Sequence, residues 1–446
     1  QVVGQEVSQA EEQWLLEEVV VTATKRAVSL QDTALSITAL GSKEIDRRNL
    51  AGMGDYLSAV PGVNMLDQAM GSNVFIIRGI ASDPDGEGST SGPSVGTYFG
   101  EVPVSGLGSF GGSVDPRMVD IERVEILRGP QGTLFGSSSL AGTVRNIPKS
   151  PNLKELEGRI KATYSNTASK GGNNSKIEGV VNIPLVEDVL AIRAVAFRHD
   201  DSGYIDNIVE SDPALSGAAT ALGAADLVVN ENDLGATKYV GGRISALWQP
   251  SDKLSVNLQY VTQEGEQKGY PWVSEGYTIS ALQFGDAYGG DNEGVDDDLE
   301  FTNLVAEYDL GWASVLSSTT WLEQTNKTRF DVTVFFLPFI QAGFRTLFFG
   351  QNTFNSDAFV QEIRLTSQLD GPLQYLLGVY YEDVESNQRR ENHTGGDLSL
   401  GLDFRASPPR FGPGNTKVSE VFKDLSTQQQ AVFGEVSYDI SEQIEL

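Results

Sequence analysis

The sequence predicts a small α+β domain followed by an antiparallel transmembrane β-barrel, and three observations support this fold class. From about residue 155 onward, polar and apolar residues alternate in segments of about ten residues, as in strands with one face in lipid. Short and long connections alternate between these segments. The residues before them combine short extended segments with helical ones, as a small α+β domain does.

Composition excludes several other classes of protein. The chain has 446 residues and a formal net charge of -29, so it lacks the basic surface that nucleic-acid binding requires. It has no cysteine, which removes disulfides, thiolate metal sites and cysteine nucleophiles. No window contains the roughly 20 apolar residues of a membrane-spanning helix. Residues 1–13 resemble no signal peptide, so we expect a mature or a truncated N-terminus.

The α+β domain is expected over residues 31–152, after an N-terminal extension of residues 1–30. Ser42 can cap a helix over residues 43–50. A second helical turn, over residues 54–59, is ended by Pro61. The remaining expected elements are extended segments at 74–78, 96–104 and 121–127, and Gly- and Ser-rich loops at 83–93 and 105–113.

The rest of the chain, residues 153–446, is expected to form barrel strands. In the segment 157–165 every second residue is polar, and Ile160, Ala162 and Tyr164 lie between them. Segments 176–183 and 253–260 repeat this pattern, which is a poor template for a helix. Aromatic residues near the strand ends are placed as an interfacial girdle requires: Trp248, Tyr260, Trp312 and Tyr438.

Connection lengths give an independent signal, because outer-membrane barrels have short turns on one side and long loops on the other. A soluble β-sandwich is the alternative, but its strands are shorter and it rarely carries several such long loops. Short connections are expected at 185–188, 250–252, 310–311, 369–372 and 439–442, and longer ones at 166–174, 201–237, 265–298, 325–354 and 386–426.

About ten strands can be counted, and another begins at residues 443–446. A sheet in hydrocarbon must close, because unpaired backbone groups there are costly. A barrel of this size would also be filled by its own side chains and could not hold the first domain. We therefore expect the chain to contain about half of a barrel of roughly 22 strands.

Several segments carry a resemblance to a known family. Residues 121–136, IERVEILRGPQGTLFG, closely resemble the hallmark plug segment of TonB-dependent outer-membrane receptors. Barrel segments such as 359–365, FVQEIRL, also resemble strands of that family. The plug residues that carry the motif are Arg123, Glu125, Arg128, Gly129, Pro130, Gly132 and Gly136. The segment that resembles a TonB box comprises Glu18, Val19, Val20, Val21, Thr22 and Ala23.

The box-like segment alone could be an ordinary core strand. Its position in a polar extension favours a free strand that adds to the sheet edge of a partner protein. The chain departs from the family pattern at Gly100, which stands where an Asp is usual, and at residues 137–142, which replace a second glycine-rich turn.

The resemblance implies TonB-dependent active transport of a scarce, bulky ligand across the outer membrane of a Gram-negative bacterium. The implied partners are TonB with its ExbB-ExbD energising complex, outer-membrane lipid and a small ligand, for which we favour a ferric siderophore. Cobalamin and oligosaccharides are the alternative ligands, and a passive porin-like channel is the alternative of another class. We expect no enzyme, no resident cofactor and no resident metal. The expected ligand-facing residues of the plug loops are Asp83, Asp85, Ser109 and Phe110.

Two further ligands are less favoured by the sequence. Haem receptors usually depend on histidines, and the chain has only His199 and His393. The acidic stretch 286–300 has oxygen ligands suited to Ca²⁺, although we interpret it as a solvated loop. A signal-transducing receptor would need a further domain ahead of the box. Only 17 residues precede Glu18, so we do not expect this role unless the N-terminus is truncated.

Overall fold

The computed structural model describes most of both expected regions. Seven predicted site residues lie outside its described residues, namely Glu18, Val19, Ala23, Asp83, Asp85, Ser109 and Phe110. The described residues are 20–22, 24–26, 28–33, 35–57, 59–66, 69–71, 73–81, 93–105, 114–136, 138–211, 213, 216–217, 230–271, 273, 280–281, 293–331, 347–395, 417–441 and 444–445.

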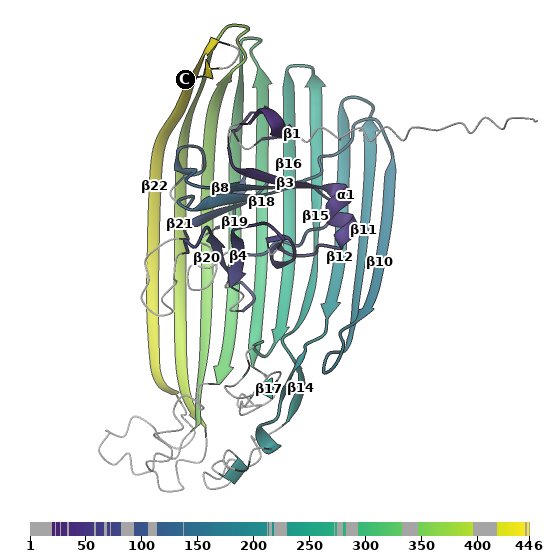
Figure 1. Ribbon diagram of the computed structural model, residues 1–446, viewed down its shortest axis with the longest axis vertical. Helices are drawn as coiled ribbons and strands as arrows, with labels where there is room; N and C mark the ends of the chain where they lie inside the picture. The colour runs from purple at the N-terminus through teal and green to yellow at the C-terminus, as the bar shows by residue number, and fades with distance from the viewer. Residues whose placement is uncertain are drawn as a thin grey trace, which may run out of the picture.

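In the part of the chain that the structure describes, eleven strands form one antiparallel sheet, and they follow one another around it in chain order. The sheet curves around the first domain, so that this domain lies on its concave side (Figure 1). This arrangement confirms the predicted fold class. The strands are β10 (Glu157–Asn166), β11 (Asn173–Val186), β12 (Leu190–Asp201), β15 (Ala236–Ser251), β16 (Leu254–Lys268), β18 (Gly294–Asp309), β19 (Ala313–Asp331), β20 (Leu347–Ser367), β21 (Leu373–Gly395), β22 (Lys417–Ser441) and β23 (Ile444–Glu445).

The two faces of this sheet differ as the alternation predicts. On β15, Ile244 is exposed on the outer face, whereas its neighbours Arg243 and Ser245 are buried on the inner face. An apolar outside and a polar inside are typical of a membrane barrel. The four predicted girdle residues are all exposed: Trp248, Tyr260, Trp312 and Tyr438.

The connections follow the predicted alternation, but the long ones are shorter than expected. Four short connections lie within two residues of their predicted places, at 187–189, 252–253, 310–312 and 368–372, and the predicted fifth, at 439–442, begins inside β22, which ends at Ser441. The segments predicted as loops at 265–298, 325–354 and 386–426 contain the outer ends of β16 and of β18 to β22. The ends of β16 and β18 carry mostly polar residues, so the hydrophobic alternation stops there before the backbone pairing does. The segment 201–237 contains β13 (Ile205–Asn207) and β14 (Glu231–Leu234), which form a small sheet with β17 (Ser280–Ala281).

The first domain is built on a five-stranded mixed sheet in the order β3-β8-β9-β6-β7. Strands β6 and β9 pair in parallel, and the other neighbours are antiparallel. In the described part of the chain, no helix is long and apolar enough to cross a membrane. The elements are β3 (Ile37–Gly41), β6 (Val95–Phe99), β7 (Val102–Pro103), β8 (Ile121–Arg128), β9 (Gly142–Pro148), the pair β4 (Val63–Leu66) and β5 (Val74–Ile77), the pair β1 (Val20–Val21) and β2 (Val28–Ser29), the 3-10 turn η1 (Leu30–Asp32), and helices α1 (Ser42–Arg48), α2 (Met53–Leu57) and α3 (Gly132–Phe135).

Several predicted boundaries in this domain are corrected by the structure. Ser42 lies inside α1, and Gly41 is the N-cap without a side-chain hydrogen bond. Helix α1 ends because Asn49 adopts a left-handed conformation, and α2 begins and ends earlier than predicted. The expected single segment 96–104 is divided into β6 and β7, because Gly100 has a φ of +63° and turns the chain.

The first domain and the barrel share one hydrophobic core. The largest cluster joins Val95, Phe99 and Ile126 of the domain to Phe301 and Leu322 of the barrel wall. The rings of Phe99 and Phe301 meet edge to face with their centroids 5.8 Å apart. Because this apolar contact is buried from both sides, the domain is seated on the inner wall and does not hang free in the lumen.

Candidate functional site

The box-like segment is part of an N-terminal hairpin, which we define as residues 20–29. Val20 pairs with Ser29 and Val21 with Val28 in antiparallel register. Val21 is fully buried, while Val20 is 45% exposed. The segment was expected to be a free strand, whereas its described residues Val20 and Val21 are paired with β2. A partner that takes the place of β2 beside this strand must therefore first open the hairpin.

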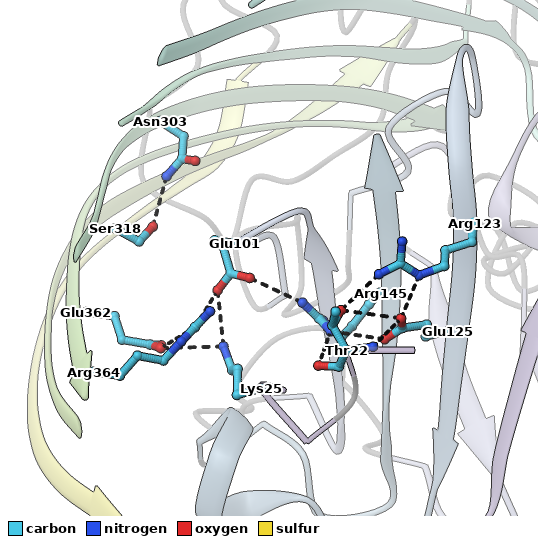
Figure 2. A network of polar contacts seen from close by, with 10 residues as sticks. All are labelled: Thr22, Lys25, Glu101, Arg123, Glu125, Arg145, Asn303, Ser318, Glu362 and Arg364. Atoms are coloured by element: carbon cyan, nitrogen blue, oxygen red, sulfur yellow. Dashed lines mark hydrogen bonds and ion pairs between the residues drawn. The ribbon is translucent and has the colours of Figure 1, made fainter. Parts of the chain in front are cut away.

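Thr22 binds the hairpin to the sheet of the first domain (Figure 2). Its backbone N–H donates to Glu125 Oε1 at 2.7 Å, and its carbonyl oxygen accepts from Arg145 Nη1 at 2.7 Å. Arg123 Nη2 donates to the Thr22 hydroxyl at 3.1 Å. Arg123 and Arg145 also form ion pairs with Glu125, which is fully buried. These contacts place the end of the box-like segment against β8 and β9.

Lys25 connects the hairpin to both the first domain and the barrel (Figure 2). Its Nζ lies 3.3 Å from Glu101 Oε2, in the turn between β6 and β7, and 3.5 Å from Glu362 Oε1 on β20. Arg364 of β20 bridges the same two carboxylates, at 2.7 Å and 2.8 Å. The ammonium also lies 4.8 Å from the centre of the Phe135 ring. One buried charged group therefore contains residues of the hairpin, the first domain and the barrel.

Arg26 extends this attachment to the short-turn end of the barrel. Its Nη2 donates to the backbone oxygen of Tyr375 at 2.8 Å and to Ser367 Oγ at 3.2 Å. Its Nη1 donates to Gln374 Oε1 at 3.1 Å. The guanidinium thus spans the connection between β20 and β21.

Burial and charge oppose each other within this group. Burial alone would raise the pKa of Glu101, but Arg364, Lys25 and Arg145 together hold it well below its ordinary value. Burial lowers the pKa of the Lys25 ammonium, against the attraction of Glu101 and Glu362. The lysine therefore bears a desolvation cost that its partners only partly offset.

The predicted plug motif is divided between two roles. Arg123 and Glu125 contact Thr22, whereas the rest of the motif shapes the turn from β8 into α3. Arg128 donates to the Pro61 carbonyl oxygen at 3.0 Å. Gly129, whose φ is +116°, and Pro130 form this turn. Gly132 begins α3, and Gly136, whose φ is +77°, ends it.

Sequence reasoning missed five residues of the charged group. One signal was available on β20. The alternation of polar and apolar residues along this strand places the charged residues Glu362 and Arg364 on the face that points into the barrel. The Gly100 departure also marked the turn that carries Glu101. Lys25 and Arg145 had no local signal, because their partners are distant in the sequence.

A second buried charged group joins the first domain to another part of the wall. Asp120, which has a φ of +58°, forms a bidentate pair with Arg193 of β12 at 2.6 Å and 2.8 Å. Arg243 of β15 donates to the same carboxylate at 2.9 Å. The Asp120 side chain is almost fully buried. This group contains no residue of the N-terminal hairpin.

A small cavity separates the first domain from strands β20 to β22. Its volume is about 80 Å³. Tyr98 and Phe135 line it from the domain, and Glu362, Glu382 and Phe433 line it from the barrel. The cavity therefore borders the charged group that contains Lys25.

Comparisons with known proteins agree with this geometry. Residues 29–143 match the family described as TonB-dependent Receptor Plug Domain. This chain carries the plug domain of the TonB-dependent receptors. The plug is the first domain described above, and its β8–α3 turn contains the hallmark motif.

Relatives and a solved structure support the same assignment. The chain is 25% identical over 216 residues to the pesticin receptor of Yersinia pestis, covering 48% of this chain and 30% of that protein. It is 26% identical over 287 residues to the vitamin B12 transporter of Vibrio vulnificus, covering 56% and 44%. The crystal structure of the ferric yersiniabactin uptake receptor of Yersinia pestis superposes with a TM-score of 0.62 at 15% identity, covering 92% of this chain and 62% of that one.

The chain thus spans less than half the length of these two relatives. The match to the solved receptor shows the fold, a plug domain within an antiparallel barrel. Together with the apolar outer face of the sheet, these matches identify an outer-membrane protein of a Gram-negative bacterium.

Proposed function

We propose that this chain belongs to a receptor that takes up a scarce, bulky ligand across the outer membrane with energy delivered by TonB. The observation that carries the proposal is the box-like strand in the N-terminal hairpin, which is bound through Thr22 and Lys25 to both plug and barrel. A partner that takes this strand acts directly on the plug attachment. We assign residues 1–30 to the extension with the box, 31–152 to the plug and 153–446 to the barrel.

The energy must come through a partner protein. The plug occupies the concave side of the sheet and shares its core with the wall, so free diffusion of a large ligand is blocked. The outer membrane holds no ion gradient of its own to drive transport. TonB, energised by ExbB-ExbD in the inner membrane, supplies the work in this proposal. Once the hairpin opens, the strand Val20–Val21 offers a free backbone edge to which TonB can add.

For the ligand we propose a ferric siderophore complex. The ferric yersiniabactin uptake receptor is among the similar structures, which favours an iron chelate. The vitamin B12 transporter keeps cobalamin as the alternative, with oligosaccharides after it. The candidate ligand-facing residues Asp83, Asp85, Ser109 and Phe110 remain part of this proposal. A receptor of this kind binds and moves its ligand without chemical change, so we propose no enzymatic activity.

Substitution of Val20 by proline tests the role of the box. Proline removes the backbone N–H and cannot complete an added strand. We expect Val20→Pro to abolish energised uptake by the full-length receptor in cells, while ferric siderophore binding to those cells stays normal. The matched control is Val20→Ala, which keeps the N–H and should transport normally.

Equal uptake by the proline and alanine variants would overturn the TonB assignment. A passive porin-like channel is the competing function, and it predicts conductance of the full-length protein in planar bilayers without TonB. Growth and binding panels with iron chelates, cobalamin and oligosaccharides separate the ligand classes. A deletion strain unaffected by iron limitation would favour cobalamin or sugars.

A further inference from the structure

A buried group of oxygen atoms surrounds Asp297 on the inner face of β18. The sequence suggested that residues 286–300 form a solvated acidic loop, but residues 294–300 lie in this strand. Asp298 points outward and is exposed, whereas Asp297 points inward and is 2% exposed. Asp297 Oδ1 accepts hydrogen bonds from Gln324 Nε2 and Asn326 Nδ2 of β19, both at 2.9 Å.

The plug completes this group with backbone atoms of the loop between β4 and β5. The Met70 carbonyl oxygen lies 3.3 Å from Asn326 Nδ2, and the Met70 N–H donates to Gln267 Oε1 at 2.8 Å. Gly71 has a φ of +72°, and a Cβ atom added there would lie 2.5 Å from Asp297 Oδ1. Only glycine allows the plug backbone to approach the carboxylate this closely.

The group has too many acceptors and no positive charge. Gln324 Oε1 and Asn326 Oδ1 are buried and have no hydrogen-bond partner. Among the ion pairs of the described residues, Asp296 pairs with Arg329 on the outer side, and none includes Asp297. A buried carboxylate without a cation is costly, and so is a buried acceptor without a donor.

Turning the two amides does not solve the problem with protein groups alone. The nitrogen and oxygen of an amide have nearly the same shape, so their assignment follows from the hydrogen bonds. The opposite orientation would place both amide oxygens 2.9 Å from Asp297 Oδ1, which is repulsive without an ion between them. Oxygen ligands that lie 2.3–2.6 Å from one Ca²⁺ ion are roughly 3 Å apart from each other, so this spacing suits a shared cation.

We propose that the group binds a small hard cation, Ca²⁺ or Na⁺, through the Asp297 carboxylate, the amide oxygens of Gln324 and Asn326, and the Met70 carbonyl oxygen. The described residues contain no group of three or more His, Asp or Glu side chains suited to a metal. This site uses one carboxylate and neutral oxygens instead, which are ligands that hard cations accept. The ion bridges β18 and β19 to the plug loop between β4 and β5, so it fastens the plug to the barrel wall.

Terbium luminescence provides the first test, because Tb³⁺ occupies sites for hard cations and is excited by nearby tyrosines. Tyr239 and Tyr270 pack in one cluster with Met70. The full-length receptor, purified in detergent and treated with EDTA, should show Tb³⁺ emission that Ca²⁺ displaces. Asp297→Asn should lose this emission, and the matched control Asp298→Asn should keep it. Equal emission from the wild type and Asp297→Asn would overturn the site.

Thermal unfolding at constant ionic strength identifies the ion. We expect CaCl₂ or NaCl, compared with choline chloride, to raise the melting temperature of the wild type and of Asp298→Asn by several degrees. The ion that does so is the occupant. Asp297→Asn should not respond and should be the more stable protein in choline chloride, because it lacks the uncompensated charge. A wild type that melts at one temperature in all three salts would contradict the proposal.

Discussion

Replacement of Lys25 by methionine tests whether the charged group keeps the N-terminal hairpin closed. Methionine retains an apolar chain of similar length but removes the ammonium, which lies within 3.5 Å of both Glu101 and Glu362. Loss of one partner from a buried ion pair costs about 3–5 kcal/mol when the other charge is left alone. Here Arg364 stays bound to both carboxylates, and the desolvation cost of Lys25 disappears. We therefore expect the closed hairpin to lose about 2 kcal/mol.

A loss of about 2 kcal/mol raises the open population of the hairpin roughly 30-fold. The chain has no cysteine, so a single Val21→Cys substitution gives a unique thiol. Val21 is fully buried, and the thiol should react with a maleimide only when the hairpin opens. When opening and closing are fast relative to labelling, the labelling rate follows the open population. The rate should rise by roughly 30-fold when Lys25→Met is added to Val21→Cys.

The matched control is Lys154→Met in the same Val21→Cys background. Lys154 carries the same charge, but its side chain is 72% exposed and forms only a surface pair with Asp188 at 3.6 Å. Surface pairs of this kind contribute little to stability, so the control should label at the rate of Val21→Cys alone. Equal labelling rates for the Lys25 variant and the control would refute the idea that this ammonium holds the hairpin.

The pH dependence of hairpin opening and the shape of the motif turn give two more predictions. Because the folded pKa of Glu101 is lowered from 4.5, its stabilisation is complete above pH 4.5 and is lost only as the pH falls through the lowered value. Labelling of Val21→Cys, corrected with a free thiol, should therefore not change from neutral pH to about pH 5, and a rise in that window would contradict the assignment. Gly129→Ala should lower the melting temperature by the equivalent of about 1–3 kcal/mol, because its φ is +116°, although an added Cβ would meet only Arg78 Nη1, at an ordinary contact distance of 3.6 Å. Gly132→Ala, at a helical position with no atom within 4 Å, is the control and should not destabilise the protein; a melting temperature of Gly129→Ala equal to that of this control would show that the turn is not strained.

The barrel could be predicted from the sequence because each membrane strand carries its own alternating pattern. The prediction failed at the outer ends of the strands, for example around Gln267 and Asp297. There the outer face no longer contacts lipid, and both faces carry polar residues. Backbone pairing continues across these residues without help from an apolar face. Hydrophobic periodicity predicts the part of a strand inside the membrane, and it does not predict how far the strand continues beyond the membrane.

The plug motif was also predictable, but the site around it was not. A turn such as the one at Gly129 leaves a local signature, because few residues adopt its backbone conformation. The charged group depends on pairs such as Lys25 with Glu362, which are 337 positions apart in the chain. No local pattern encodes such a pair. The resemblance identified the box-like strand, and the structure added that Val21 is buried in a hairpin.

The plug is attached to opposite parts of the wall in different ways. Toward β12, β15 and β16 the polar contacts of the described residues come from the plug itself. Asp120 binds Arg193 and Arg243, and the Arg117 N–H donates to Gln263. These contacts do not depend on whether the N-terminal hairpin is open or closed.

Toward β20 and β21 the attachment depends on the hairpin. Lys25 and Arg26 supply contacts to both strands or their connection, and Glu101 with Arg364 joins the plug directly to β20. Opening the hairpin removes the first two attachments and leaves Glu101 with fewer positive partners. The cavity lined by Glu382 already lies along this part of the wall. Force applied to the box acts on the contacts with β20 and β21, while the contacts with β12 and β15 persist. We therefore expect the plug to loosen first beside β20 to β22, where the existing cavity can widen with the smallest movement of protein.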